Sequence, residues 1–486
     1  MRIKTLLFAA LLLLTSVRSA FASVGDKFVV GELQYTVLGE DFTVSVSHID
    51  NDYSLSGALT IPATVENDGT TYTVTNLPGD AFSYCDNLTS ISIPSTVTTI
   101  APNAFYIAPG LTELTVDENN MAYCAVDGIL YDKAVTQIIR CPQQKSGVVE
   151  LPQTITSIGN YSFVGCSKIT AVNIPDGLTL IGERAFLYCS SLTSITIPAN
   201  TVLDSNNYSP FGACTSLTKI NITDGNTSAK VADDFLLSYD GTKIFYSLSR
   251  AEQIQIPDQI KALAGYSFAG SPITSITIPK NVVSLTQQTF SYCQNLTSID
   301  VDAENSTFES VDGVLFNKTK KLYAYPGGRT GEYVIPDDTQ EIVNGAFMGS
   351  SVSAIVIPNS VKTIRSSAFT DAGNLKKITF KSSTPPSGMS YVCFYGTPNN
   401  LMIVVPDGSK EAFQTEMPYL KDHIFDESGA AAIVEVAVDS EEAIDYTQPI
   451  EVFDLSGKKV ATNIKSVKAG IYIIKQNDKS AKVAVK

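Results

Sequence analysis

One seven-residue stretch, Leu-Thr-Ser-Ile-Thr-Ile-Pro, returns along most of this chain and limits what the chain can fold into. Its clearest copies begin at Leu88, Ile169, Leu192, Ile273 and Val352. Self-similarity at a fixed period is typical of architectures in which each copy is one structural unit and neighbouring copies bury a shared core. We therefore expect a repeat solenoid, rather than a single compact core, for these 486 residues.

Each repeat supplies two walls and one aromatic turn, as the copy that begins at Ile169 illustrates. Its first half alternates like a short strand, which ends at Pro175 because proline lacks a backbone donor. Leu178 and Ile181 begin a second wall, and we expect Phe186 to lie in a single helical turn and to fill the core. Burying about six such side chains per coil, at roughly 1.5–3 kcal/mol each before entropy, gives a substantial core.

The spacing of the proline separates regular coils from interrupted ones. Pro152, Pro175 and Pro198 lie 23 residues apart, whereas three other gaps are 57, 58 and 59 residues long. Each long gap contains two apolar runs joined at Asp-Lys, Asp-Gly or Asn-Lys. We interpret these segments as β-hairpins inserted in the coil.

The N-terminus has the features of an export signal. Arg2 and Lys4 precede an apolar run, and Ala20-Phe21-Ala22 matches the small-x-small pattern of a cleavage site. The run is too short to span a bilayer, and no later stretch approaches ~18 apolar residues. We therefore expect an exported protein that does not span a membrane.

Five segments follow from these patterns. They are a signal peptide (1–22), an N-terminal β cap (23–78), repeats with three inserted hairpins (79–383), a C-terminal cap of the solenoid (384–427) and a small β domain (428–486).

The full repeat, L-T-S-I-x-I-P-x-x-V-x-x-I-x-x-x-A-F-x-x-C, resembles the BspA-like leucine-rich repeats of surface proteins of Bacteroidetes. The stretch Val311-Asp-Gly-Val-Leu-Phe resembles the hairpin of that family. The resemblance implies a right-handed, mainly β coil of the leucine-rich-repeat type with short helical turns. It also implies secretion, and binding or adhesion at the cell surface or outer membrane.

The last segment, 428–486, is similar to the C-terminal sorting domain of the type IX secretion system. It lacks the upstream Asn-Pro hairpin that such domains carry, so a plain β module is the alternative.

Composition argues against nucleic-acid binding and catalysis. The net charge of −15 does not suit a phosphate backbone, and a catalytic triad needs a histidine to relay a proton. The two histidines, His48 and His423, are expected at opposite ends of the solenoid. The acidic loops 117–120, 224–226 and 302–305 offer oxygen ligands for calcium, but turn chemistry also explains them. We expect no catalytic residue, no cofactor and no metal site.

The cysteines fall into two groups. Five of them follow a phenylalanine by three residues, and we expect buried thiols there: Cys85, Cys166, Cys189, Cys214 and Cys293. Cys124 and Cys141 flank a hairpin, so a disulfide between them stays open.

Two sets of residues are candidate partner-binding sites. The first faces outward from the first wall: Thr193, Ser194, Thr196, Thr274, Ser275 and Thr277. The second lies in the hairpins: Tyr131, Tyr239, Tyr246, Phe316, Tyr323 and Tyr325. Aromatic anchors dominate tight interfaces, so the hairpins are the better candidates where their rings are exposed.

These observations lead to one main hypothesis. The chain is a non-enzymatic exported repeat protein that binds a macromolecule, such as a host-matrix or other surface protein, in the manner of an adhesin. The alternative is a glycan-binding component of a surface polysaccharide system. The outward strip lacks aromatic platforms on which a sugar could stack, which favours a protein partner.

Overall fold

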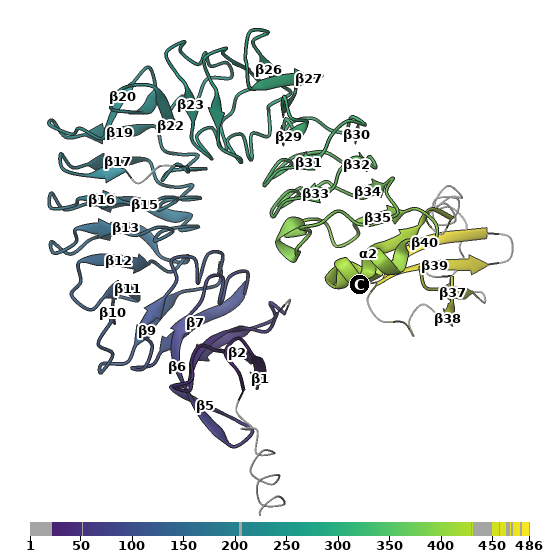
Figure 1. The fold of residues 1–486 in the computed structure, drawn as a ribbon, viewed down its shortest axis with the longest axis horizontal. Helices are drawn as coiled ribbons and strands as arrows, with labels where there is room; N and C mark the ends of the chain where they lie inside the picture. The colour runs from purple at the N-terminus through teal and green to yellow at the C-terminus, as the bar shows by residue number, and fades with distance from the viewer. Residues whose placement is uncertain are drawn as a thin grey trace, which may run out of the picture. The chain divides into compact units, whose positions relative to one another are not determined.

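The computed structural model describes residues 22–428, 430, 450–455, 457–462, 467, 470–476 and 479–485, apart from 51 and 204–206. The expected signal peptide lies outside these residues, except for its last position. The chain divides into two compact units, Met1–Gly313 and Val314–Lys486, both built mainly from β-strands (Figure 1).

The N-terminal unit begins with a sheet that does not follow the repeat. Its strands are β1 (Lys27–Val30), β2 (Leu33–Val37), β3 (Thr43–His48), β5 (Thr64–Asn67), β6 (Thr70–Leu77) and β8 (Thr99–Ile100). They pair in the order β1-β2-β3-β6-β5, and β6 also pairs in parallel with β8. Tyr72 and Val74 of β6 are fully buried, so this sheet covers the first coil of the stack.

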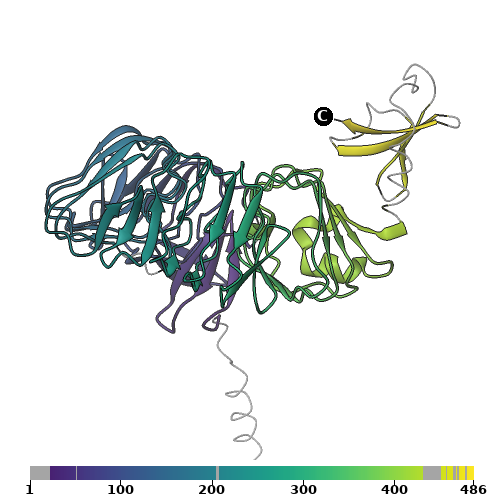
Figure 2. The same cartoon turned by 90° about the horizontal axis from the view of Figure 1, so that it is seen from above.

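The first wall consists of the strands that lead into the repeat's proline. In the N-terminal unit these are β4 (Ser56–Thr60), β7 (Asn87–Ile93), β9 (Glu113–Val116), β13 (Ser146–Glu150), β15 (Lys168–Asn173), β17 (Ser194–Ile197), β19 (Lys219–Ile222), β24 (Ser275–Ile278) and β26 (Ser298–Val301). They pair in parallel, and Figure 2 shows strands of successive coils running side by side. Ile195 and Ile197 are buried while Thr196 between them is exposed, as the alternation predicts.

The second wall consists mostly of two-residue strands. In the N-terminal unit they are β12 (Gln137–Arg140), β14 (Ser157–Ile158), β16 (Leu180–Ile181), β18 (Val202–Leu203), β22 (Lys243–Ser247), β23 (Ala262–Leu263) and β25 (Ser284–Leu285). Their inward residues, such as Ile158 and Ile181, are fully buried.

The expected hairpins are present and contain one strand more than the sequence pattern indicates. The inserted strands are β10 (Tyr123–Val126), β11 (Ile129–Asp132), β20 (Ala229–Ala232), β21 (Phe235–Ser238), β27 (Phe308–Val311) and β28 (Val314–Asn317). In the first insertion, β11 pairs antiparallel with both β10 and β12. Because β12 also pairs in parallel with β14, the insertion continues the second wall instead of projecting from it.

A chain of tight turns replaces the single helical turn expected around Phe186. The N–H groups of Ala185, Leu187 and Cys189 donate to carbonyls three residues earlier. The alternate N–H groups, of Phe186 and Tyr188, donate to carbonyls of the next coil. These inter-coil bonds use donors that a helix would keep within the segment.

Rings and thiols stack inside the coils. The ring centroids of Phe163, Phe186 and Phe211 lie 4.9 and 5.5 Å apart. The Cys189 thiol donates to the Phe163 carbonyl at 3.2 Å, and the Cys214 thiol donates to the Phe186 carbonyl at 3.0 Å. The five repeat cysteines are free and buried, which confirms the prediction.

Cys124 and Cys141 are also free. Cys141 is buried among the core residues, whereas Cys124 is partly exposed and lies opposite Tyr131 in the β10–β11 pair. The Cys124 thiol instead donates to the Asp132 carbonyl at 3.4 Å.

The coils of the N-terminal unit follow an arc tight enough for distant coils to touch (Figure 1). The hydroxyl oxygens of Tyr188 and Tyr292 lie 3.4 Å apart, and Arg184 Nη2 donates to Gln288 Oε1 at 3.4 Å. Both contacts join residues 104 positions apart. Side chains therefore join coils that are not neighbours in the stack.

Arg184 is the centre of this contact. Its guanidinium carbon lies 3.4 Å from the ring centroid of Tyr208 and 5.6 and 5.5 Å from those of Tyr161 and Tyr266. Arg184 Nη1 also donates to the Tyr161 hydroxyl at 2.6 Å. We call Arg184 with these three tyrosines, Tyr188 and Tyr292 the tyrosine hub.

The C-terminal unit also has two walls. The first wall is β30 (Glu332–Val334), β32 (Ala354–Ile357), β34 (Lys377–Phe380), β35 (Met402–Val405) and β36 (Ile424–Asp426), and the second is β29 (Lys321–Ala324), β31 (Glu341–Ile342) and β33 (Thr363–Ile364). The helices described in this unit are short: η1 (Tyr391–Phe394), α2 (Lys410–Glu416) and η2 (Pro418–His423).

The tail forms a small antiparallel sheet in the order β38-β37-β39-β40. Its strands are β37 (Glu451–Phe453), β38 (Lys459–Ala461), β39 (Gly470–Gln476) and β40 (Lys479–Val485). Val452 and Ile474 are fully buried in it.

Candidate functional site

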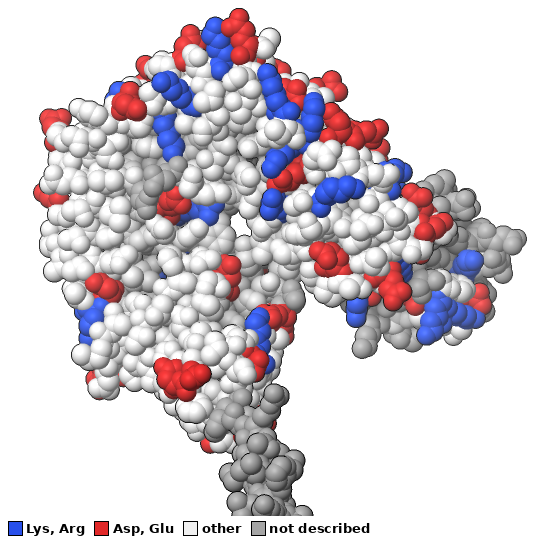
Figure 3. Space-filling view, viewed as in Figure 1, with Lys and Arg blue, Asp and Glu red and all other residues white. Residues whose placement is uncertain are grey.

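The outward side of the first wall carries the six hydroxyl residues that the sequence singles out. Thr193 donates both its N–H and its hydroxyl to the carbonyl of Thr170 in the preceding coil, at 3.3 and 3.5 Å. Thr274 donates in the same way to the Glu252 carbonyl, at 2.8 and 3.2 Å. These paired bonds hold the side chains of Thr193 and Thr274 against the preceding coil. On the face drawn in Figure 3, charged side chains are sparse over the coils of the N-terminal unit.

The six residues form two triads on this wall, one at Thr193, Ser194 and Thr196 and the other at Thr274, Ser275 and Thr277, and their members differ in exposure. Thr193, Thr196 and Thr277 are exposed, and Ser194, Thr274 and Ser275 are partly buried. The triads do not contact each other, because β19 and the segment 253–256 lie between them.

Most of the hairpin aromatics do not meet the condition of exposure. Tyr131, Tyr246, Phe316 and Tyr325 are only 2, 1, 2 and 5% exposed, so their assignment as partner anchors is wrong. Tyr323 is partly buried. Tyr239, at the turn between β21 and β22, is 56% exposed and stays a candidate.

The buried rings have a place in the core because the hairpins continue the second wall. Tyr246 lies 6.4 Å from Phe211 at the end of the interior ring stack, and its hydroxyl donates to the Cys214 carbonyl at 2.8 Å. Tyr325 stacks on Phe347 with ring centroids 5.0 Å apart. Tyr325 thus takes the position that phenylalanine holds in regular coils, since its N–H donates to the Ala346 carbonyl as that of Phe347 donates to Ala368. In the coil of Tyr246 the next residue, Ser247, makes this bond, to the Ser267 carbonyl.

A groove opens in the first wall beside the second triad. It has a volume of about 570 Å³ and lies between the segment Gln253–Asp258 and β24. Ser275 and Thr277 line one side, Gln253 and Gln255 line the other, and Asp302 lies at the edge. The lining offers amide, hydroxyl and carboxylate groups around an apolar floor.

The groove exists because the ladder between two coils is interrupted. In three other coils the N–H before the proline donates across the wall: Ile61 to Ser92, Leu151 to Asn173 and Ile335 to Val356, at 3.0, 3.3 and 3.0 Å. Ile174, between β15 and β17, makes no such bond among those described. The corresponding pair is Ile256 and Thr277. Among the described hydrogen bonds, no backbone bond joins these two residues. A single bridge, Gln253 with Ser275, takes the place of a ladder.

One residue distinguishes this coil from the three coils in which that bond is made. The position five residues before the proline is glycine in three comparable coils, Gly57, Gly147 and Gly331, with φ of 72°, 77° and 86°. A positive φ is easy for glycine and costly for other residues. Glu252 holds this position at the groove and does not adopt a positive φ. Pairing with β24 is here limited to the bridge between Gln253 and Ser275.

The rim of the groove is acidic. Lys280 Nζ pairs with Glu304 at 2.7 Å on the exposed surface. The hydrogen bond and charge of Glu304 raise the pKa of Lys280, and the charges of Asp302 and Asp258 contribute further. Three carboxylates thus surround one ammonium group.

The acidic loops hold their shape through a buried asparagine. Asn226 donates to the carbonyls of Pro198 and Thr201 and accepts from the N–H groups of Ser228 and Ala229, at 2.8 to 3.0 Å. Asn120 and Asn305 repeat this pattern in the other two loops. Turn chemistry therefore explains the asparagines. In the part of the chain that the structure describes, no cluster of three or more His, Cys, Asp or Glu residues could hold a metal.

The two histidines bind backbone groups. His48 Nδ1 lies 2.7 Å from the Ile49 carbonyl, and His423 Nδ1 lies 2.9 Å from the Leu401 carbonyl. Within the described ranges no helix is long and apolar enough to cross a membrane.

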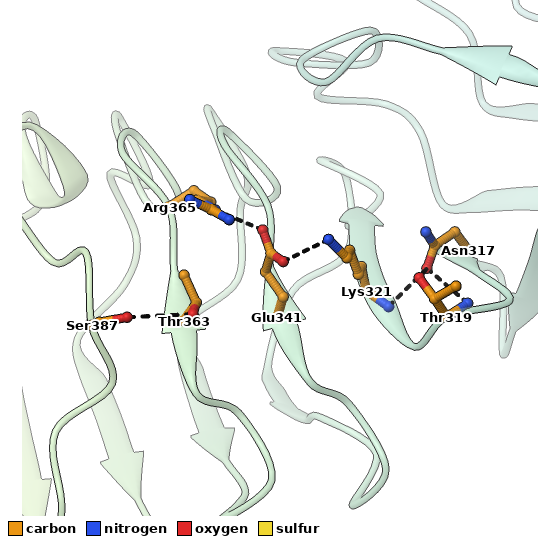
Figure 4. A network of polar contacts seen from close by, with 7 residues as sticks. All are labelled: Asn317, Thr319, Lys321, Glu341, Thr363, Arg365 and Ser387. Atoms are coloured by element: carbon orange, nitrogen blue, oxygen red, sulfur yellow. Dashed lines mark hydrogen bonds and ion pairs between the residues drawn. The ribbon is translucent and has the colours of Figure 1, made fainter.

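The second wall of the C-terminal unit carries a polar network of another kind (Figure 4). Glu341 pairs with Lys321 of the preceding coil at 2.8 Å and with Arg365 of the following coil at 2.7 Å. Burial alone would raise the pKa of Glu341, but hydrogen bonds from Arg365 and Lys321 lower it below its ordinary value. The network joins coils and satisfies its own charges, so we do not regard it as a binding site.

Comparison with known families agrees with this architecture. The family model described as BspA type leucine rich repeat region matches in 6 copies, over residues 65–125, 141–232, 237–325 and 340–419. The chain belongs to this BspA-type family.

Solved structures with similarity to this BspA-type chain are leucine-rich repeat proteins. One, a leucine rich cell surface protein from Faecalibacterium prausnitzii, is 22% identical, with 82% of this chain and 98% of that chain covered and a TM-score of 0.33. Another, from Bacteroides ovatus, is 19% identical, with 82% and 99% covered and a TM-score of 0.26. A third, from Eubacterium ventriosum, is 17% identical, with 78% and 100% covered and a TM-score of 0.31. No curated protein matches the chain.

Two lining residues of the groove, Ser275 and Thr277, belong to the outward strip that the sequence of this BspA-type protein predicts. The opposite side, Gln253 and Gln255, and the acidic edge are not part of that prediction. The available signal was Glu252, where the other hairpin-bearing coils have glycine.

Proposed function

We propose that this chain is an exported, non-enzymatic protein that binds a protein partner at the cell surface in the manner of an adhesin. The observation that carries the proposal is the outward side of the first wall, where the hydroxyl side chains of Thr193, Thr196 and Thr277 are exposed. Solenoids use extended surfaces of this kind for binding. Tyr239, which lies between the two groups of hydroxyl residues in the sequence, supplies one exposed aromatic anchor.

The second candidate is a glycan-binding component of a surface polysaccharide system. The polar lining of the groove favours it, because amide, hydroxyl and carboxylate groups all bond to sugar hydroxyls. None of the lining residues of the groove is aromatic, so the groove lacks a stacking platform. We therefore rank a protein partner first.

Binding of the full chain to an array that carries both extracellular-matrix proteins and glycans separates the two candidates. We expect signal on proteins, weakened at least tenfold when Thr196→Lys and Thr277→Lys place cations on the exposed strip. Thr156→Lys is the matched control, since Thr156 is also exposed but precedes a second-wall strand. Signal on glycans alone would refute the first candidate. Equal weakening by the control would remove the strip as the site.

We further propose that the tail sheet directs export through type IX secretion. Its support is the sequence similarity together with a small antiparallel sheet. Fractionation of cells should show a surface form without the tail. A periplasmic protein with its tail retained would contradict the proposal.

A further inference from the structure

The interrupted ladder leaves backbone groups without their usual partners on both sides of the groove. In the comparable coils these groups bond to each other, as Leu151 does to Asn173. Here the N–H of Ile256 and the carbonyl of Thr277 make no backbone hydrogen bond among those described. An exposed strand edge of this kind is a template on which another extended chain can pair.

Resting on the proposed protein-binding function, we propose that this groove receives an extended peptide segment of the partner. The peptide backbone pairs with Ile256 and Thr277, and a Lys or Arg side chain of the peptide lies at the carboxylates of Asp258 and Asp302.

The side chains of the groove fit an extended peptide. Ile256 is buried, and Ile254 and Pro279 are partly exposed, which gives an apolar floor beneath the backbone groups. Gln253 and Gln255 are exposed on one side, and each can both donate and accept a hydrogen bond. In strand addition the backbone supplies affinity, and alternate side chains enter pockets that supply specificity.

Charge selects a basic peptide over an acidic one. Asp258, Asp302 and Glu304 surround Lys280, so the rim keeps an excess of negative charge. The whole chain carries a net charge of −15, which speeds the approach of a basic partner at low salt. The absence of an aromatic ring from the lining argues for a peptide rather than a sugar.

The test selects random linear dodecapeptides displayed on phage against the full chain, and then measures the enriched peptides by fluorescence polarisation. Glu252→Gly is the decisive variant, because glycine at this position can adopt the positive φ that keeps the other coils paired. Protection of the Ile256 amide against hydrogen exchange reports whether the groove has closed. Asp258→Asn with Asp302→Asn removes the acidic edge without changing the backbone. Asp337→Asn is the matched control, since Asp337 also follows the repeat's proline and is exposed, but its strand β30 pairs with the following coil.

We expect the selected peptides to be rich in Lys and Arg, and to bind about tenfold more weakly after either Glu252→Gly or loss of both carboxylates. N-methylation of alternate backbone amides should weaken them comparably, and Asp337→Asn should leave binding unchanged. Peptides that bind wild type and a closed Glu252→Gly groove equally would overturn the proposal, and so would enrichment of acidic peptides. If Glu252→Gly does not protect the Ile256 amide, the double asparagine variant and the methylated peptides decide instead.

The outcome also separates this inference from the function on which it rests. If the chain binds proteins on the array but no selected peptide depends on the groove, the proposal that the groove receives a peptide is refuted and the protein-binding function stands. No protein partner and no peptide would refute both.

Discussion

Replacement of Arg184 tests whether the tyrosine hub holds the arc of the N-terminal unit. The guanidinium is partly buried, and it combines one close ring contact, two longer ones and a hydrogen bond to Tyr161. A desolvated cation–π contact contributes about 2 kcal/mol, and an exposed one about 0.5–1 kcal/mol. A hydrogen bond from a charged donor adds about 1.5–3 kcal/mol. Part of this sum is offset because alanine removes the cost of keeping a cation out of water.

We therefore expect Arg184→Ala to lower the free energy of unfolding by about 3 kcal/mol. Urea denaturation followed by tyrosine fluorescence measures the change. Arg365→Ala is the matched control, since Arg365 is 55% exposed in its pair with Glu341 and such a pair contributes about 0–1 kcal/mol. Arg184→Lys should fall between the two, because it keeps the charge but loses the plane that lies against Tyr208.

Two results would refute this reasoning. One is a loss for Arg184→Ala no larger than that for Arg365→Ala. The other is a double-mutant cycle of Arg184→Ala with Tyr208→Leu that gives no coupling energy. The contact between the two side chains predicts a coupling energy of about 1–2 kcal/mol.

Three further outcomes follow from the core, the loops and the second wall. Iodoacetamide at pH 8 should modify the partly exposed Cys124 first. Burial raises the pKa of Cys214 to about 12, so this thiol should react only when the protein unfolds. Equal rates of modification of the two cysteines, measured by mass spectrometry, would contradict this. Asn226→Ala should lower the free energy of unfolding by about 2–4 kcal/mol, because it removes the hydrogen-bond partner of four backbone groups. Replacement of the exposed neighbour, Asp224→Ala, should lower it by less than about 1 kcal/mol, and denaturant unfolding measures both. The pKa of Glu341 in the folded state lies below its ordinary 4.5, so the contribution of this carboxylate to stability is complete above pH 4.5 and is lost as the pH falls through the lowered value. The difference in unfolding free energy between wild type and Glu341→Gln should therefore narrow below about pH 4.5. A difference that stays constant with pH would count against the network.

Local pattern was sufficient to predict the walls and the buried thiols. Ile195 and Ile197 alternate with exposed Thr196, and a period of two leaves them only one face to bury. The thiols keep one register relative to the phenylalanines, so parallel stacking places them in a column inside the coils. The hairpins were recognised from apolar runs and turn residues, but the strand before each one, such as β10 (Tyr123–Val126), was not.

The hub and the burial of the hairpin rings depend on geometry that a local pattern does not contain. The arc is the sum of small rotations from coil to coil, so contact between Tyr188 and Tyr292 could not be read from either repeat. The sequence contains one indication of this contact, because a tyrosine precedes the cysteine of the repeat at both positions. The burial of Tyr246 and Tyr325 follows from strands that return to the second wall, a pairing that the hairpin pattern alone does not specify.

The groove shows how a repeat can gain a site without losing its core. Ile256 is 2% exposed although the ladder beside it is broken, because the apolar pattern and the pairing of β23 with β22 and β25 still hold this coil in the stack. Backbone pairing there depends on the conformation five residues earlier, where Glu252 replaces glycine. The cost is a few backbone bonds that water can replace at the surface, about 0.5–1.5 kcal/mol each. Selection can therefore open one gap in a long wall by a single change outside the core. A loss of positive-φ glycine against an intact apolar pattern is the signal that would find such gaps in related repeats.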